Sequence, residues 1–352
     1  MKNIHMGLNE NPNNLLSKKL NCFLKKNLSQ AVCYYPDPNA SSLKELLAKK
    51  FNLAPQNFFI SNGSDEILFI LGSIMTDVKY VICPQNTFNS YKYLANLYKK
   101  TLIETPLLNY VVDIEKLIKK IRPNSMLIIP NPHNPCGTYI GKEKLEELIK
   151  SCKNKKAYLV VDEAYGEFAE AEKDDYLSAL SLSNYSRMIV MKTFSKFYGL
   201  AGLRCGYAIA VPDFIQQMNF SKKILVYSVN TVALMAAQFV LKHETVSKNK
   251  KMFEYIFKLK QRLYKFCENH QLHYVPSCTN FILVNVGNAD SVYHQLLKRG
   301  ITTKSCSVFG FPEFLRVTLS SMKDLIKFEK ELLSILKKDH FFDKTTVTSD
   351  RL

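Results

Sequence analysis

The sequence lacks any apolar run long enough to cross a membrane. The longest hydrophobic stretches of this 352-residue chain, such as residues 68–75, fall well short of the roughly 20 residues that a spanning helix needs. The N-terminal residues Met-Lys-Asn-Ile-His also lack the apolar core and the small-residue cleavage site of a signal peptide. We therefore expect no association with a membrane.

Paired cysteines are also missing. The nine cysteines are scattered, odd in number and never spaced as Cys-x-x-Cys. This pattern argues against a disulfide framework and against a zinc site, so no metal is expected. Because unpaired cysteines are typical of reducing compartments, we expect a cytoplasmic location.

Acidic residues are fewer than basic ones, which gives a formal net charge of +17. A nucleic-acid-binding protein would gather its basic residues on one face. Here they fall in different predicted helices and turns, for example at Lys18, Lys49 and residues 153–156 and 248–251. The charge pattern thus predicts a solvated basic surface and no nucleic-acid partner. A positive field would still attract anionic substrates such as phosphate esters.

Short apolar runs alternate with helical patterns in the middle of the chain. The predicted strands are residues 58–60, 80–82, 126–129, 158–161, 188–191 and 207–210, and the predicted helices are residues 65–75, 90–98, 112–121 and 142–152. Such alternation predicts βαβ units and an α/β fold with a mainly parallel sheet covered on both faces.

The remaining segments predict a smaller α+β domain and two flanking regions. Helical patterns cover residues 213–220, 231–242, 244–270, 291–299 and 322–337, and strands are predicted at 272–275, 281–286 and 315–319. We expect an extended N-terminal arm at residues 1–40, a large domain at 41–240, a small C-terminal domain at 241–340 and a polar, frayed tail at 341–352.

Two segments at predicted strand ends suit an anionic ligand. Residues 62–66, Asn-Gly-Ser-Asp-Glu, open a helix whose free N–H groups and positive end favour a phosphate. The same letters are also an ordinary helix-capping signature. Residues 131–137, Asn-Pro-His-Asn-Pro-Cys-Gly, lie where open α/β sheets place ligands, although they could equally form a proline-rich turn.

Three further segments place charged residues at or inside apolar strands. Asp162 and Glu163 end one strand, and a buried carboxylate there needs a cation, such as a protonated pyridine ring. Residues 192–207 combine Lys196, a candidate Schiff-base lysine, with hydroxyls, glycines and Arg204. Arg316 lies within an apolar strand, where a planar fork suits a carboxylate or a phosphate.

Taken in this order, the segments resemble the fold-type I, class I/II pyridoxal-phosphate aminotransferases, and within them the histidinol-phosphate aminotransferases. The motifs Asn-Pro-x-Asn-Pro-x-Gly, Asp-Glu-Ala-Tyr and Ser-Lys followed by Gly-Leu-Arg carry the likeness, which extends from residue 8 to the last helix. The resemblance implies a homodimer with shared active sites and pyridoxal 5'-phosphate as the cofactor.

The resemblance also implies residue roles. Lys196 would hold the cofactor as a Schiff base and move a proton, Asp162 would keep the ring nitrogen protonated, and Tyr165 would bind the ring hydroxyl oxygen. The remaining expected contacts are Asn134 to the same oxygen, Phe88 stacked on the ring, Gly63, Ser64, Asp65, Ser195 and Arg204 at the phosphate, Tyr35 at the phosphate of the neighbouring subunit, and Arg316, Lys304 and Asn9 at the substrate.

Three departures from the histidinol-phosphate pattern bear on the substrate. The chain reaches the Asn-Glu-Asn-Pro motif already at Asn9, and Lys304 stands where an arginine is usual. Residues 227–230 and 304–307 are similar to threonine-phosphate decarboxylases. We therefore expect amino transfer between glutamate and a small phosphorylated amino or keto alcohol: histidinol phosphate, or a smaller compound such as dihydroxyacetone phosphate giving serinol phosphate. The alternative is decarboxylation of phosphoserine or phosphothreonine.

Overall fold

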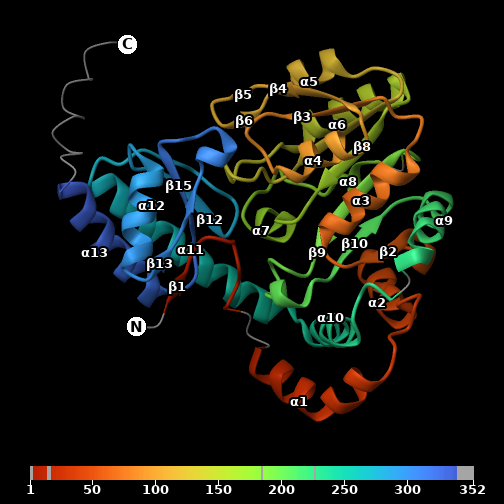
Figure 1. The fold of residues 1–352 in the computed structure, drawn as a ribbon, viewed down its shortest axis with the longest axis horizontal. Coiled ribbons are helices and arrows are strands. Elements are labelled where there is room, and N and C mark those ends of the chain that lie inside the picture. Colours follow the sequence, from red (N-terminus) through yellow and green to blue (C-terminus); the bar gives the residue numbers. More distant parts are fainter. Residues whose placement is uncertain (1–2, 14–16, 184, 226, 339–352) are drawn as a thin grey trace.

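A computed structural model describes residues 3–13, 17–183, 185–225 and 227–338, which form two lobes (Figure 1). The large lobe surrounds a seven-stranded sheet, and the small lobe surrounds a four-stranded sheet. The predicted tail at 341–352 lies outside the described residues, and the predicted domain boundaries stay predictions.

The seven-stranded sheet is mostly parallel and has one reversed strand. Its order is β2-β10-β9-β8-β7-β3-β4, and only β10 runs antiparallel to its neighbours. The strands are β2 (Phe58–Ser61), β3 (Tyr80–Pro84), β4 (Thr101–Thr105), β7 (Ser125–Pro130), β8 (Tyr158–Asp162), β9 (Met188–Thr193) and β10 (Gly206–Ile209). The carboxyl ends of β7, β8 and β9 therefore meet at one edge of the sheet, where α/β folds bind ligands.

Helices cover both faces of this sheet because its strands are apolar on both sides. Val160 packs in one cluster with α3 (Ser64–Ile74), α4 (Ser90–Leu97) and α9 (Pro212–Ser221), whereas its neighbour Val161 packs with α5 (Ile114–Lys120) and α6 (Lys142–Lys155). The predicted α/β fold with a mainly parallel, doubly covered sheet is confirmed. Shorter elements of the lobe are β5 (Leu107–Leu108), β6 (Val111–Val112), α7 (Gly166–Glu170) and α8 (Ala179–Leu182).

The small lobe contains an antiparallel sheet of order β11-β12-β15-β14. Its elements are α11 (Val246–Asn269), β11 (Tyr274–Val275), β12 (Phe281–Asn285), α12 (Ala289–Lys298), β13 (Ile301–Thr302), β14 (Lys304–Ser305), β15 (Phe314–Thr318) and α13 (Met322–Lys338). The arm joins this lobe through β1 (Ile4–His5), which pairs with β13. The arm thus passes β15 and reaches the space between the lobes.

Several elements were not predicted from the sequence. Residues within the expected extended arm form α1 (Ser17–Cys33), because Leu20 and Phe23 make an apolar face against α10 (Thr231–His243). The others include α2 (Ser41–Phe51), the edge strand β4, the hairpin of β5 and β6, the short helices α7 and α8, and the two-residue strands β1, β13 and β14. Within the described part of the chain, no helix is long and apolar enough to cross a membrane.

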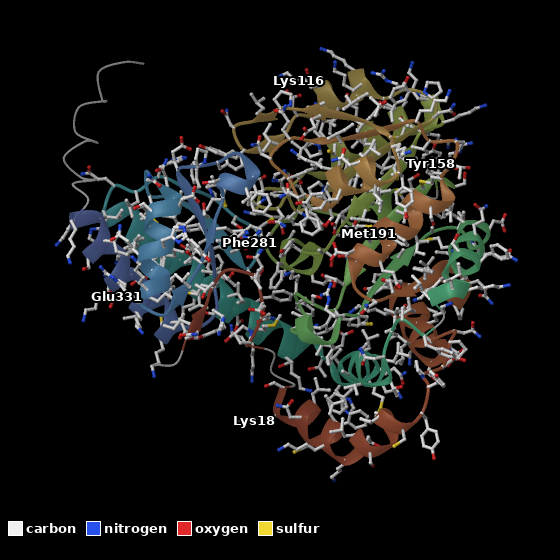
Figure 2. All side chains as sticks on the ribbon, viewed as in Figure 1. Lys18, Lys116, Tyr158, Met191, Phe281 and Glu331 are labelled. Carbon is white, nitrogen blue, oxygen red and sulfur yellow. The ribbon has the colours of Figure 1, made fainter. Side chains whose placement is uncertain are left out.

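Basic side chains are spread over the surface, as the sequence suggested. Figure 2 labels Lys18 on α1 and Lys116 on α5 at opposite ends of the molecule. Lys192, in strand β9 of the large sheet, is instead buried. Lys192 is 2% exposed and forms an ion pair at 3.1 Å with Glu163, which is fully buried. Glu167 lies 3.6 Å from the same ammonium group.

Removal of Glu163 should destabilise the fold, because it leaves the buried Lys192 charge with only the more distant Glu167. Ser178 and the Ala179 N–H would also lose their acceptor. We expect Glu163→Ala to lower the free energy of unfolding by about 3 kcal/mol or more, measured by urea denaturation. The control is Glu147→Ala, which removes a half-exposed pair with Lys144 and should change stability by less than about 1 kcal/mol. Equal effects of the two variants would contradict this account.

Candidate active site

A cavity of about 650 Å³ lies at the carboxyl edge of the large sheet, between the two lobes and the arm. Most of the predicted site residues line it: Asn9, Ser64, Asp65, Phe88, Asn134, Asp162, Tyr165, Ser195, Lys196, Arg204, Lys304 and Arg316. Phe281 of β12, labelled in Figure 2, lies where the small lobe faces this cavity and packs edge-on against Tyr165, with ring centroids 5.1 Å apart. The fold therefore brings together residues that are more than 300 positions apart in the sequence.

Lys196 follows the end of β9 and points its amine into the cavity. Its Nζ donates a hydrogen bond of 2.8 Å to the backbone carbonyl oxygen of Leu8, in the arm. The ammonium also lies 5.8 Å from the centre of the Tyr165 ring. Neither contact is an ion pair, so among the described residues the amine is held in place by a neutral carbonyl group and an aromatic ring.

Asp162 is buried at the end of β8 and is short of positive charge. Its two carboxylate oxygens accept hydrogen bonds from the Tyr91 hydroxyl (2.8 Å) and from the Ala164 backbone N–H (3.1 Å). Burial raises the pKa of Asp162 to about 6, although both hydrogen bonds act to lower it. A cation facing this carboxylate from the cavity would lower the pKa again and stabilise the ionised form.

The start of α3 forms a cradle that suits a phosphate group. Gly63 has φ +78° and supplies no side-chain cap, so N–H groups at the helix start are left for another acceptor. A Cβ atom on Gly63 would lie 2.5 Å from the Arg204 Nη2, and one on Gly206 would lie 3.0 Å from the Ser64 backbone nitrogen. Glycine at both positions therefore keeps the backbone and the guanidinium close together.

Three polar side chains converge beside this cradle. Arg204 Nη1 lies 3.4 Å from the Ser195 hydroxyl oxygen, and Arg204 Nη2 lies 3.5 Å from an Asp65 carboxylate oxygen. Asp65 in turn accepts a hydrogen bond from the Ser90 hydroxyl. The donor set of a helix start, a hydroxyl and a guanidinium fits the phosphate of a cofactor, and the buried Asp162 fits the ring nitrogen at its other end.

The opposite wall of the cavity comes from the arm and the small lobe. The side chain of Asn9 donates to the Tyr165 hydroxyl oxygen at 2.8 Å. Arg316 is buried, donates to the Asn134 side-chain oxygen and to the Gly7 carbonyl oxygen, and has an Nε atom without a partner among the described residues. Asn9 thus contacts a site residue directly, and Arg316 joins the arm to both lobes.

Lys304 and Arg316 face each other across an antiparallel strand pair. The register of β14 and β15 places Lys304 directly opposite Arg316, and both side chains line the cavity. Like charges directly opposite each other are destabilising in a sheet. The described residues show no ion pair between either side chain and a carboxylate. An anion bound between the two cations would relieve their repulsion.

Two predicted site residues do not line the cavity: Gly63, which directly precedes the lining residue Ser64, and Tyr35. The side chain of Tyr35 is 81% exposed and stacks on Tyr227, with ring centroids 4.5 Å apart. The expected role of Tyr35 in the neighbouring subunit stays a prediction.

Sequence reasoning missed several residues of the site. Tyr91, fully buried on α4, binds Asp162, and the carbonyl oxygens of Gly7 and Leu8 bind Arg316 and Lys196. Phe309 also lines the cavity beside Arg316. Tyr91 lies three residues after Phe88, at the start of α4, and this closeness in the sequence was its signal. Backbone carbonyl groups leave no signal in a sequence.

Comparison with known proteins agrees with this geometry. The family model for aminotransferase class I and II matches residues 3–326. A histidinol-phosphate aminotransferase of Caldicellulosiruptor saccharolyticus is 36% identical, with 95% of this chain and 92% of that protein covered. Another histidinol-phosphate aminotransferase, from Moorella thermoacetica, is 34% identical, with 88% of this chain and 79% of that protein covered.

Solved structures show the same fold. The histidinol-phosphate aminotransferase of Sinorhizobium meliloti in complex with pyridoxal-5'-phosphate has a TM-score of 0.83 at 23% identity, covering 96% of this chain and 91% of that one. The Thermus thermophilus aspartate aminotransferase with maleate has a TM-score of 0.82 at 20% identity, covering 94% and 91%. The predicted family, fold type and cofactor are confirmed: this chain belongs to the class I and II aminotransferases and is a pyridoxal-phosphate-dependent enzyme.

Proposed function

We propose that the enzyme transfers an amino group between glutamate or 2-oxoglutarate and a small phosphorylated amino or keto alcohol. The observation that carries the proposal is the pair of cations, Lys304 and Arg316, opposite each other on the cavity wall without a carboxylate partner in the described part of the chain. The names of the relatives favour histidinol phosphate as the phosphorylated substrate. A smaller compound, such as dihydroxyacetone phosphate giving serinol phosphate, fits the same pair.

We assign the cofactor contacts as follows. Lys196 holds pyridoxal phosphate as a Schiff base and moves the proton at the substrate carbon, since its amine reaches the cavity and binds there only the neutral Leu8 carbonyl group among the described hydrogen-bond partners. When bound, the cofactor supplies an electron sink for negative charge at that carbon. Asp162 keeps the ring nitrogen protonated. The other proposed contacts are Gly63, Ser64, Asp65, Ser195 and Arg204 at the phosphate, Asn134 and Tyr165 at the ring oxygen, and Phe88 against the ring face.

The substrate contacts divide between the two cations and the arm. Arg316 lies deeper and offers a planar fork, which suits a carboxylate or a phosphate. Lys304 offers a point charge and is only partly buried, which suits contact with the longer, phosphorylated anion. Asn9 orients Tyr165 and closes the site from the arm.

Two variants test the cofactor assignment. Lys196→Ala should lose the visible absorbance that borohydride reduces, because no Schiff base can form. Asp162→Asn keeps the shape of the site but removes the charge, so it should retain that absorbance and lose turnover by at least about 100-fold, on the order of 3 kcal/mol of transition-state stabilisation. A reducible adduct in Lys196→Ala, or near-normal turnover in Asp162→Asn, would refute the respective role.

The substrate is tested by incubating the holoenzyme with 2-oxoglutarate and a phosphorylated amino compound, namely histidinol phosphate, serinol phosphate, phosphoserine or phosphothreonine, while following 2-oxoglutarate consumption and carbon dioxide release. We expect consumption of 2-oxoglutarate without carbon dioxide release.

Arg316→Ala should lower kcat/KM at least about 30-fold in both half-reactions, because a charge-assisted bond in a desolvated site is worth roughly 2–5 kcal/mol. Lys304→Ala should impair mainly the phosphorylated substrate.

Two results would change this conclusion. Release of carbon dioxide from phosphoserine or phosphothreonine would favour the decarboxylase alternative. Unchanged stopped-flow kinetics of Lys304→Ala with every phosphate ester would remove Lys304 from the site.

We further propose that two subunits share their active sites and that Tyr35 completes the site of the partner. Support comes from the exposed Tyr35 and Tyr227 stack and from an apolar groove between α3 and α4 that includes Phe69 and Tyr93 and shares Asp65 with the cavity. Large exposed apolar patches commonly mark protein interfaces.

The cytoplasmic location expected from the sequence stays a prediction.

Mixing two inactive variants tests the shared site. Combined Tyr35→Ala and Lys196→Ala subunits should regain part of the activity, because a mixed dimer would hold one intact site. Sedimentation of the wild type should show a dimer. A fully active monomer would contradict the proposal, and so would full activity of Tyr35→Ala alone.

A further inference from the structure

One short segment of the small lobe shapes the cavity wall that faces the substrate. Residues 304–310, here named the cavity loop, comprise β14 and the short 3-10 helix η4 (Ser307–Phe309). Lys304, Val308 and Phe309 of this loop line the cavity. The position of the loop therefore sets the distance between the Lys304 amine and the rest of the site.

The attachment of the cavity loop to its own sheet is weakened by two like charges. It begins in β14, an edge strand of two residues, in which Lys304 lies directly opposite the Arg316 cation. Because like charges in this register repel each other, and because a short edge strand has few ladder bonds, β14 alone would hold Lys304 weakly. Other contacts must therefore hold the loop in place.

The first tie comes from within the small lobe. Asp290, in the first turn of α12, accepts hydrogen bonds from the Ser305 hydroxyl and from the Ser307 hydroxyl at 2.8 Å. These two bonds lower the pKa of Asp290. The carboxylate thus binds the loop at the residues on both sides of Cys306, while Lys304 and Phe309 line the cavity.

The second tie crosses between the lobes. Asn86 follows β3 of the large lobe, and its side-chain amide donates a hydrogen bond of 2.6 Å to the Phe309 carbonyl oxygen. Phe309 itself packs against the Arg316 guanidinium, whose central carbon lies 5.7 Å from the ring centre. The amide of Asn86 therefore supports one of the two cations through the ring of Phe309.

Two backbone features fit this contact. Asn86 has φ +55° and Gly310 has φ +82°, so both adopt the left-handed conformation. A Cβ atom on Gly310 would lie only 2.3 Å from the Asn86 side-chain nitrogen. Any other residue at position 310 would therefore displace the amide as well as strain the backbone.

Asn86 also lies next to the residues proposed to contact the cofactor. The Thr87 hydroxyl lies 3.4 Å from the Asn134 carbonyl oxygen, and Phe88 follows on the cavity wall. Residues 86–88 thus reach the proposed cofactor position through Phe88 and the cavity loop through Asn86.

We propose that Asn86 is a positioning residue for substrate specificity: its bond to Phe309 fixes the cavity loop against the large lobe and sets the spacing of Lys304 and Arg316. The inference rests on the proposed function only in requiring that this pair binds an anion. Asn86 does not touch the substrate. It acts by keeping the two cations in place before binding, which reduces the cost of ordering them around the anion.

The test compares Asn86→Ala with Asn124→Ala in the holoenzyme. Asn124 has φ +56°, is exposed and lies before β7, so its replacement brings a similar backbone penalty without a bond to the small lobe. The measurements are the inhibition constants of inorganic phosphate and of glutarate, the cofactor dissociation constant and the melting temperature. Loss of one neutral hydrogen bond should weaken inhibition by both anions about fivefold in Asn86→Ala.

The expected pattern is weaker anion binding and a higher KM, with cofactor binding and kcat changed less than about twofold and with a melting temperature similar to that of Asn124→Ala. Asn86→Asp, which cannot donate to the carbonyl oxygen, should bind anions at least as weakly as Asn86→Ala. Equal inhibition constants in Asn86→Ala and Asn124→Ala would overturn the proposal, as would a parallel loss of cofactor affinity. Wild-type enzyme inhibited by glutarate but not by phosphate would contradict the phosphorylated substrate, and the glutarate values would then decide the role of Asn86.

Discussion

The cavity depends on the hydrogen bonds of the buried Arg316 guanidinium group. It comes from a small-lobe strand, and it binds the Asn134 side chain of the large lobe and the Gly7 carbonyl oxygen of the arm. Because a buried charge needs hydrogen-bond partners to offset its desolvation, this one side chain requires all three parts of the chain to meet. Its charge remains available to an anion, since both partners are neutral. Structure and binding therefore use the same group.

Two adjacent carboxylates have different roles: Asp162 belongs to the cavity, and Glu163 stabilises the fold. Asp162 ends β8 and faces the cavity, whereas Glu163 turns to the other side and binds the buried Lys192. Successive residues of an extended strand point in opposite directions, so two neighbouring carboxylates reach different environments. Glu163 already has its cation. Asp162 forms no ion pair with any residue that the structure describes, which leaves it suited to a cationic ring.

The parts of the fold predicted best from the sequence are those encoded by local periodicity. The strands and helices of the parallel sheet appeared as apolar runs separated by helical patterns, because burial on both faces leaves little polar interruption. The helix α1 was missed, since Pro12 and Pro36 nearby suggested an extended arm and its apolar face has meaning only against α10. The edge strand β4 was missed because its side chains are half exposed.

The sequence by itself determined the chemistry that is available: a lysine after a strand, a carboxylate at a strand end, and glycines and an arginine in one loop. Such residues sit in short motifs, and backbone geometry within a few residues constrains their spacing. Only the tertiary structure decided which groups meet across the chain, namely Tyr91 with Asp162, Leu8 with Lys196 and Asn86 with Phe309. The first contact arises from the packing of α4 on the large sheet, and the other two from the packing of the arm and the small lobe against the large lobe. The latter two use backbone carbonyl groups that every residue possesses, so no local pattern can encode them.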